Sequence, residues 1–357
     1  MSAQHAKFPR ILAISLATTQ IGLNSPLLLD ILPPQAVEEL CFAALLGPLI
    51  WEYRLVAYDT IVCVKQVPDT ANITGDAMKA DGTVNRAALP TIFNPEDLHA
   101  LEAALQIRER FGGTVTVIAM GPLAACEVLR ESLCRGADRA ILLNDRRAAA
   151  SDTLATSYIL SQAVRKIAQY DLVFCGRQAI DGDTAQVGPQ LAEKLNIPQI
   201  TYFEKLVDLA DKTIRVRRNV GNGWEVLEAR LPILVTVVDS ANEPRSAAAK
   251  RMMQFKRARS SGEILAAVAK ELPDAEAQKQ EAAQRIAQMR QAGTLIEQWD
   301  LDDIQADLQW CGLAGSPTKV HRVQSIVLTK EGFTAVNASE EGISTMIHEL
   351  IVDHTLG

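Results

Sequence analysis

From Thr60 onward, short apolar runs alternate with stretches that have the periodicity of helices, and this alternation constrains the fold more than any other feature. The apolar runs are rich in β-branched residues and have the length of buried parallel strands. They lie at 60–67, 114–120, 140–143 and 171–175. Helices are expected at 96–110, 123–134, 152–169 and 185–195. Strand–helix alternation predicts a parallel sheet that is covered by helices on both faces.

The period of the pattern changes after the last of these helices. Residues 214–217 alternate Ile and Val with Arg, and Asn222-Gly223 is a two-residue hairpin signal. Residues 224–230 are expected to return as the second strand of the hairpin, and 231–238 as a further apolar strand. The sequence therefore predicts an antiparallel addition at the end of the α/β core.

Three regions follow from these patterns. Residues 1–58 are rich in proline and show no clear repeat, and we interpret them as an extension of uncertain order. Residues 59–245 form the α/β domain. Residues 246–357 are expected to contain a basic connector, an exposed helix that is interrupted near Pro273, and a C-terminal arm. The apolar residues of 343–351 share one helical face, which must dock somewhere.

Composition and charge exclude several classes of protein. Hydrophobic residues make up 48% of the 357 residues and charged ones 22%, which is enough to form a sizeable core. The net charge of −7 makes nucleic acid an unexpected partner, because phosphate binding favours a basic surface. The longest apolar stretch near the start, 43–51, is too short to span a bilayer. Cytoplasmic localisation is expected.

The six cysteines do not predict a disulfide framework or a metal centre. None of them forms a Cys-x-x-Cys pair, and several lie in apolar runs, so we expect buried small hydrophobic residues. The five histidines are far apart and show no metal-ligand spacing. No Gly-x-Gly-x-x-Gly or Gly-x-x-x-x-Gly-Lys-Ser/Thr motif is present, and no catalytic triad can be argued. No catalytic residue and no metal ligand is therefore assigned.

Three loops follow predicted strands at their carboxyl ends, where open α/β sheets bind ligands. They are Val67-Pro68-Asp69-Thr70, Met120-Gly121-Pro122 and the segment 176–188.

The third loop is the most informative. Gly176 and Gly182 would let the backbone approach a ligand, and Arg177 would add a positive charge. Asp183 or Thr184 could cap the next helix, whose first amides would then bind a phosphate or pyrophosphate. An ordinary capped turn remains the alternative.

Two further segments have the character of a helix start and an exposed loop. Asn94-Pro95-Glu96-Asp97 places Asn at a cap position and Pro at the first helical position. Its carboxylates would repel phosphate, so any ligand contact should be to a base or a ribose hydroxyl. Asn242-Glu243-Pro244-Arg245 follows the last apolar strand and is interpreted either as a loop that closes the sheet or as a docking element.

Taken together, these segments resemble the beta subunit of an electron-transfer flavoprotein. The resemblance covers about 59–259 and depends on the joint order of its motifs. The motifs are Val64 to Thr70, Asn94-Pro95, Ala137-Asp138, Gly176 to Gly188 and Asn242 to Arg245.

The resemblance implies an α/β fold of the adenine-nucleotide-binding type and a heterodimer with an alpha subunit. In ordinary members the beta subunit holds a structural AMP, whereas in the electron-bifurcating branch a second FAD takes this place. The implied nucleotide contacts are Cys63, Asn94, Pro95, Glu96, Asp97, Met120, Gly176, Arg177, Gln178, Ala179, Ile180, Asp181, Gly182, Asp183, Thr184, Ala185, Gln186 and Val187. With FAD, the isoalloxazine would also meet Pro68, Asp69 and Thr70.

The Val67-Pro68-Asp69-Thr70 loop and the tail Gly312 to Thr318 resemble the bifurcating branch. Docking to a dehydrogenase or other redox partner is implied for Ala241, Asn242, Glu243, Pro244 and Arg245, although the family often has a bulky aliphatic residue where Ala241 stands. Three interpretations stay open: a bifurcating subunit with FAD, an ordinary carrier subunit with AMP, and a nucleotide-binding regulatory module. The docking segment argues against the third.

Overall fold

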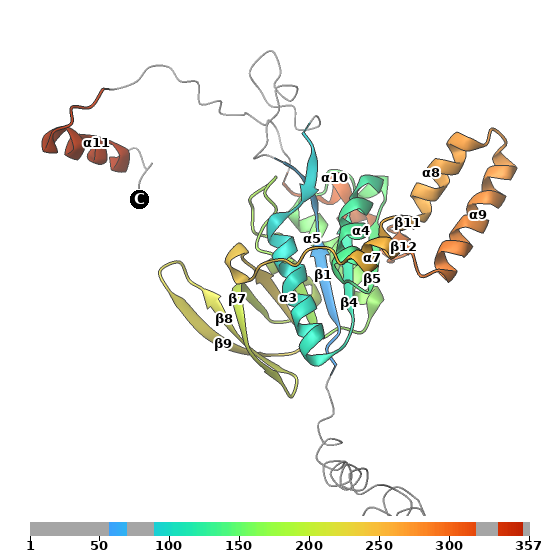
Figure 1. The fold of residues 1–357 in the computed structure, drawn as a ribbon, viewed down its shortest axis with the longest axis horizontal. Helices are drawn as coiled ribbons and strands as arrows, with labels where there is room; N and C mark the ends of the chain where they lie inside the picture. Colours follow the sequence, from blue (N-terminus) through green and yellow to red (C-terminus); the bar gives the residue numbers. More distant parts are fainter. Residues whose placement is uncertain (1–56, 70–88, 319–334, 353–357) are drawn as a thin grey trace, which may run out of the picture. The chain divides into compact units, whose positions relative to one another are not determined.

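A computed structural model describes residues 57–69, 89–318 and 335–352. Its main part is a ten-stranded sheet in the order β11-β12-β5-β4-β1-β6-β10-β7-β8-β9 (Figure 1). The sheet is parallel from β11 to β7, and only β8 and β9 are antiparallel. The α/β class with an antiparallel addition, predicted from the sequence, is thus confirmed. The seven parallel strands of the core region are β1 (Thr60–Val64), β4 (Val115–Met120), β5 (Arg139–Leu143), β6 (Leu172–Gly176), β7 (Gln199–Ala210), β10 (Ile233–Val237) and β12 (Leu295–Trp299).

Helices cover both faces of this sheet. Successive residues of each central strand are therefore buried on opposite sides. Val62 and Val64 of β1 pack into one apolar cluster, and Ile61 and Cys63 into the other. The first cluster includes α3 (Pro95–Phe111) and α4 (Cys126–Arg135), and the second includes α5 (Thr153–Ile167) and α6 (Val187–Leu195). These helices agree with the predicted ones within a few residues.

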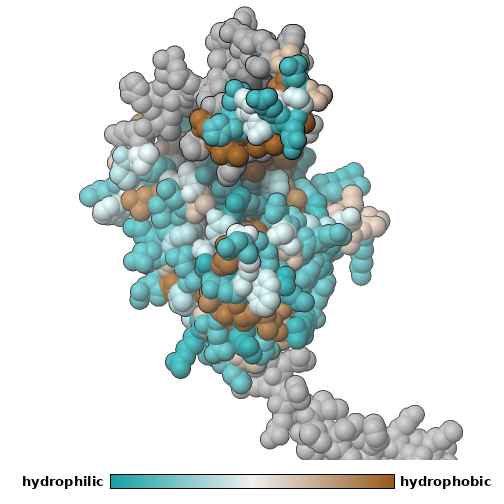
Figure 2. Space-filling view, turned by 90° about the vertical axis from the view of Figure 1, so that its left-hand side faces the viewer, coloured by the Kyte–Doolittle hydropathy of each residue, from teal (hydrophilic) through white to brown (hydrophobic). Residues whose placement is uncertain are grey.

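The antiparallel hairpin is present, but its predicted turn is wrong. Strand β8 (Thr213–Asn219) pairs with β9 (Trp224–Arg230), and Asn219 lies opposite Trp224. Four residues, 220–223, therefore form the connection instead of Asn222-Gly223 alone. Gly221 takes the positive φ of 86°, and its amide donates to Asn219 Oδ1 at 2.6 Å. Figure 2 views the side where β8 and β9 lie in Figure 1, and apolar surface is visible there among hydrophilic areas.

The other edge of the sheet comes from the C-terminal region and was not predicted. Strand β12 lies beside β5, and β11 (Arg259–Ser260) pairs with the other side of β12. Helices α8 (Ser261–Glu271) and α9 (Ala275–Gln291) connect β11 to β12. The predicted break near Pro273 is confirmed. The basic connector contains a further helix, α7 (Ala249–Phe255), which packs on α4.

After β12 the chain forms the short helices η7 (Leu308–Trp310) and α10 (Gly312–Gly315). The remaining 3-10 turns are η4 (Leu123–Ala125), η5 (Arg146–Ala148) and η6 (Asp239–Ala241). Strands β2 (Gln66–Pro68) and β3 (Thr91–Phe93) form a separate two-stranded sheet.

The chain divides into two compact units, and the second consists of residues 68–92 and 318–357. Within it, α11 (Glu340–Val352) confirms the expected helix, and its apolar side chains Ile343, Met346, Ile347 and Ile351 are exposed. The predicted extension 1–58 lies almost wholly outside the described residues. In the part of the chain that the structure describes, no helix has the length and apolar character needed to cross a membrane. Cys63, Cys126, Cys134, Cys175 and Cys311 are buried free thiols.

Candidate functional site

A cavity of about 450 Å³ lies where strands β1, β4 and β6 end and helices α5 and α6 begin. Its volume falls in the range that is typical of small-molecule sites, and its place at the carboxyl ends of parallel strands is the usual one. The residues that line it are Cys63, Val64, Lys65, Asp97, Met120, Gly121, Ala148, Ala149, Ala150, Ser151, Asp152, Thr153, Thr156, Leu160, Cys175, Gly176, Arg177, Gln178, Ala179, Asp181, Gly182, Thr184, Ala185, Gln186, Val187 and Gly188.

Two cysteines form part of the cavity wall. Cys63 and Cys175 are register partners on the neighbouring strands β1 and β6, and both are buried. The hydrogen bond from Cys63, together with burial, raises the pKa of Cys175 well above its ordinary value. Because the thiolate is the reactive form of cysteine, Cys175 is suited to packing and not to nucleophilic chemistry.

The first turn of α3 holds the 176–188 loop by side-chain contacts. Asn94 donates through Nδ2 to the Gln178 carbonyl at 2.9 Å and accepts from the Ile180 amide at 3.1 Å. Asn94 stands at the N-cap of α3, with Pro95 as the first helical residue, but its side chain makes no cap hydrogen bond. The side-chain amide of Asn94 instead holds the 176–188 loop.

Two buried carboxyl groups complete this arrangement. Asp97 accepts from the Lys65 amide at 2.9 Å and from the Gly176 amide at 3.0 Å. Burial raises the pKa of Asp97 to about 7, although its hydrogen bonds oppose this shift. Glu96 accepts from the Gln178 amide at 2.8 Å and pairs with Arg177 at 2.8 Å. The Asn94 to Asp97 segment therefore acts mainly as a support for the loop, and only Asp97 of these four residues lines the cavity.

The two glycines of the loop have different surroundings. A Cβ atom on Gly176 would lie 2.4 Å from Asp97 Oδ1 and 2.8 Å from the Asp97 amide nitrogen. A Cβ on Gly182 would meet nothing within 4 Å. Gly176 therefore allows its backbone to pack closely against the first turn of α3.

Helix α6 begins later than predicted, and neither Asp183 nor Thr184 caps it. The N-cap residue is Gln186, which makes no side-chain cap hydrogen bond. Its Oε1 instead accepts from Thr153 Oγ1 at 2.9 Å, which joins the starts of α5 and α6. Val187 and Gly188, the first two residues of α6, line the cavity, and their amides have no side-chain cap, an arrangement that favours an anion. The third residue, Pro189, has no amide proton to donate.

Both cations of the cavity wall are paired with carboxylates. Lys65 Nζ lies 2.7 Å from Asp181, and Arg177 is paired with Glu96. The positive charge that the sequence suggested for Arg177 is therefore largely compensated. Negative ligand groups would depend on the α6 amides, or on an exchange of Lys65 from Asp181 to the ligand.

One wall of the cavity was missed in the sequence. Residues 148–153, with Thr156 and Leu160 of α5, line it although no motif pointed to them. The signal was present, because this loop also follows the end of a parallel strand. Of the predicted contacts, Pro68, Asp69, Asn94, Pro95, Glu96, Ile180 and Asp183 do not line the cavity, and Thr70 lies outside the described residues.

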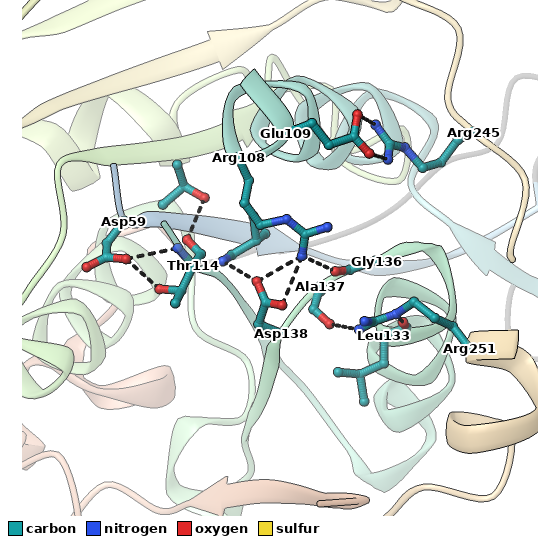
Figure 3. Close-up of polar contacts among 12 residues, drawn as sticks. Asp59, Arg108, Glu109, Thr114, Leu133, Gly136, Ala137, Asp138, Arg245 and Arg251 are labelled. Carbon is teal, nitrogen blue, oxygen red and sulfur yellow. Dashed lines mark hydrogen bonds and ion pairs between the residues drawn. The ribbon is translucent and has the colours of Figure 1, made fainter. Parts of the chain in front are cut away.

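The predicted docking segment 241–245 is held on α3. Asn242 donates to the His99 carbonyl at 3.0 Å, and Arg245 pairs with Glu102 at 2.7 Å. Figure 3 shows the second ion pair of Arg245, with Glu109. Glu243 is exposed at the middle of the segment. Burial alone would raise the pKa of Glu102, but the hydrogen bonds and charge of Arg245 outweigh it and lower this pKa. Arg245 therefore positions the segment.

An Arg245→Ala variant is expected to lower the free energy of unfolding by about 1 to 2 kcal/mol, because it leaves the buried Glu102 carboxylate without its cation. Chemical denaturation of the variant measures this loss. Lys250→Ala, which removes an exposed cation of the neighbouring helix, should change stability by less than about 0.5 kcal/mol. Equal stability of the two variants would show that Arg245 does not anchor the segment.

Comparison with known proteins agrees with this architecture. The family model described as "Electron transfer flavoprotein domain" matches residues 81–261. The chain is 38% identical to the electron transfer flavoprotein subunit beta of Clostridium acetobutylicum over 82% of this chain and 98% of the relative. It is 40% identical to the protein FixA of Bradyrhizobium diazoefficiens, over 82% of this chain and 91% of that protein. The chain is 43% identical to the electron transfer flavoprotein subunit beta of Megasphaera elsdenii, over 74% of this chain and 86% of that protein.

The family match covers half of the chain, and the relatives are matched over most of their length. The region matched by the family model contains β4, β6, α5 and α6 of the cavity, whereas β1 precedes it. This chain therefore belongs to the electron transfer flavoprotein family, in the group of beta subunits that includes FixA.

Proposed function

We propose that this chain binds FAD in the cavity between α5 and α6 and, with an alpha subunit, transfers electrons from NADH or a dehydrogenase by flavin-based bifurcation. FAD would supply the redox chemistry, since it accepts electrons in pairs and passes them on singly. The chain's own residues would bind the cofactor, orient it and exclude water. The buried free thiols fit the cytoplasmic localisation expected from the sequence.

The extent of the cavity carries this proposal. The motif-based contacts for AMP are Cys63, 94–97, Met120 and 176–187. The cavity continues beyond them to residues 148–153 and to Thr156 and Leu160 of α5. AMP would leave this second wall without a ligand, whereas a dinucleotide has a further half to place there.

The residues can be assigned to the parts of such a ligand by their chemistry. The uncapped first turn of α6 suits the pyrophosphate, since its amides are oriented donors at a positive helix end. The carboxyl group of Asp97 suits a polar group of the adenosine end. Met120 and Leu160 offer apolar surface to a ring system.

A structural AMP in an ordinary carrier subunit is the second candidate. Pro68 and Asp69, which were expected to meet an isoalloxazine, are not among the residues that line the cavity. This observation favours the smaller ligand. The two candidates share the same site and the same alpha subunit, so they differ only in what is bound.

Partner surfaces fit a heterodimer. Helix α11 exposes Ile343, Met346, Ile347 and Ile351 on a segment that has no apolar partner among the described residues of its own unit. An alpha subunit would cover this face. The segment 241–245, with Glu243 outward, would meet the dehydrogenase or other redox partner. Arg245 would contribute by holding the segment in place.

Nucleotide content decides between the two candidates. The heterodimer is expressed, purified and denatured, and its nucleotides are identified and counted by chromatography and mass. Two FAD per alpha–beta pair are expected, because the cavity extends past the AMP contacts. One FAD and one AMP would refute the FAD assignment and leave the ordinary carrier. A cavity that retains neither nucleotide would refute both.

A further inference from the structure

The wall of the cavity that the motifs do not explain is made by the loop before α5. Residues 148–153 run from the last residue of η5 to the first residue of α5, and Asp152 caps α5 by accepting from the Ala155 amide at 3.0 Å. This loop lacks the regular backbone hydrogen bonds that hold a helix or a strand. Its shape must therefore come from contacts with another part of the chain.

Those contacts come from the tail that follows β12. Ser316 Oγ accepts from the Asp152 amide at 2.8 Å and donates to the Gly312 carbonyl at 2.7 Å. The Gly312 amide donates to Ser151 Oγ at 3.1 Å, and that hydroxyl donates to the Ala148 carbonyl at 2.7 Å. Two serine hydroxyls thus join segments that lie about 160 positions apart in the sequence.

Close backbone packing accompanies these bonds. Gly312 has a φ of +59°, and a Cβ atom there would lie 2.1 Å from the Arg147 carbonyl oxygen. Only glycine allows the tail to approach the loop this closely. Ser316 is 3% exposed, so its hydroxyl is enclosed between the two segments. Figure 1 shows α10 beside α5.

The chain from the end of β12 to Asp307 contacts the residues on both sides of this loop. The Asn144 amide donates to the Trp299 carbonyl at 2.9 Å, and Arg147 pairs with Asp302 at 2.8 Å. The Asp307 amide donates to the Tyr158 hydroxyl of α5 at 2.9 Å. Tail contacts therefore fix the chain before the loop, the loop itself at Ser151 and Asp152, and the helix that follows it.

We propose that residues 311–316, which we call the tail clasp, set the shape of the 148–153 wall and thereby the affinity of the cavity for its nucleotide. Ser316 does not line the cavity. It is a positioning residue that acts through Ser151 and Asp152, which do. This inference rests on the proposed function, because it takes the cavity to be the nucleotide site.

A Ser316→Ala variant in the full heterodimer tests the proposal. Alanine removes the acceptor of the Asp152 amide, so the wall loses its fixed position. We expect the dissociation constant of the nucleotide to rise about tenfold in calorimetric titrations with FAD and with AMP. The matched control is Ser132→Ala, a buried serine of α4 whose hydroxyl donates to the Val128 carbonyl at 2.7 Å away from the cavity. Its dissociation constant should stay within about twofold of the wild type.

Stability and affinity separate a positioning role from a merely structural one. The melting temperature should fall by a similar amount in both serine variants, but only Ser316→Ala should bind the nucleotide more weakly. Should Ser316→Ala not fold, Ser316→Cys keeps the volume and provides only a weak acceptor, and the same ranking is expected. Equal affinity of the Ser316 and Ser132 variants overturns the inference and leaves the proposed function intact. A wild-type heterodimer that binds neither FAD nor AMP in this cavity overturns the proposed function itself.

Discussion

Gly176→Ala is expected to lower the free energy of unfolding by about 2 to 3 kcal/mol. The added methyl group would overlap Asp97 Oδ1 and lie 2.8 Å from both the Asp97 nitrogen and the Glu96 carbonyl carbon. These neighbours include the backbone of the first turn of α3, which cannot rotate away like the end of a side chain. Strand β6 and helix α3 would have to separate.

That separation would also break the polar contacts that fix the 176–188 loop. The Gly176 amide would lose Asp97, and the Gln178 amide would lose Glu96. Nucleotide affinity should therefore fall together with stability. Denaturant titration at a fixed nucleotide concentration measures the stability change, and retention of nucleotide through gel filtration measures the second effect.

Gly182→Ala is the matched control in the same loop. A Cβ atom at Gly182 would meet nothing within 4 Å, and its φ does not lie in the left-handed region. This variant should keep its stability within about 0.5 kcal/mol, or gain slightly from a less flexible unfolded chain. If both glycine variants were equally stable, Gly176 would not be needed for the contact between β6 and α3.

The α/β core could be predicted from the sequence because the signals for its strands and helices are local. Buried parallel strands are continuous apolar runs, such as 171–175, and helix starts such as Asp152 carry their own caps. The rule that ligands bind at the carboxyl ends of parallel strands also placed the Gly176 to Val187 loop at the cavity. No contact between distant segments was needed for these predictions.

The elements that were missed depend on long-range pairing. Strand β12 is five residues long, with four of them only half-buried, and it becomes a strand because β5 lies beside it. The role of Ser316 depends on Asp152, 164 positions earlier. Likewise, Gln186 is an N-cap without a cap bond because Thr153 uses its side chain. None of these three relationships leaves a periodic or local signal in the sequence.

Asp97→Asn is expected to remove a pH dependence of stability that the wild type shows between about pH 4 and pH 7. Burial raises the pKa of Asp97 from 3.8 to about 7 in the folded chain. An acid whose pKa is raised by folding stabilises the fold while it is protonated. This contribution is complete below pH 3.8 and is lost as the pH rises through about 7.

The size of the effect follows from the same linkage. Between pH 5 and pH 8, the wild type should lose about 2 to 3 kcal/mol through this one group. Asparagine does not titrate, so the stability of the variant relative to the wild type should rise by this amount over the interval. The asparagine side chain has only one oxygen, so it cannot accept from both the Lys65 amide and the Gly176 amide as the two carboxylate oxygens do. This loss lowers the stability of the variant by an amount that does not depend on pH.

Urea titrations of both proteins at several pH values measure the difference, and ionisable groups that do not interact with Asp97 cancel in it. Glu96, Arg177, Lys65 and Asp181 are charged side chains of this turn and loop, and they are present in both proteins. Asp69→Asn would be a poor control because it changes another buried acid. Asp302→Asn changes an exposed acid that does not contribute to the pKa shift of Asp97, and it should leave the pH profile unchanged. A stability difference between Asp97→Asn and the wild type that stays constant from pH 5 to pH 8 would show that Asp97 is ionised throughout. Its hydrogen bonds, from the Lys65 and Gly176 amides and the Asn94 side chain, would then outweigh its burial, and the α3 turn would carry a permanent negative charge into the cavity.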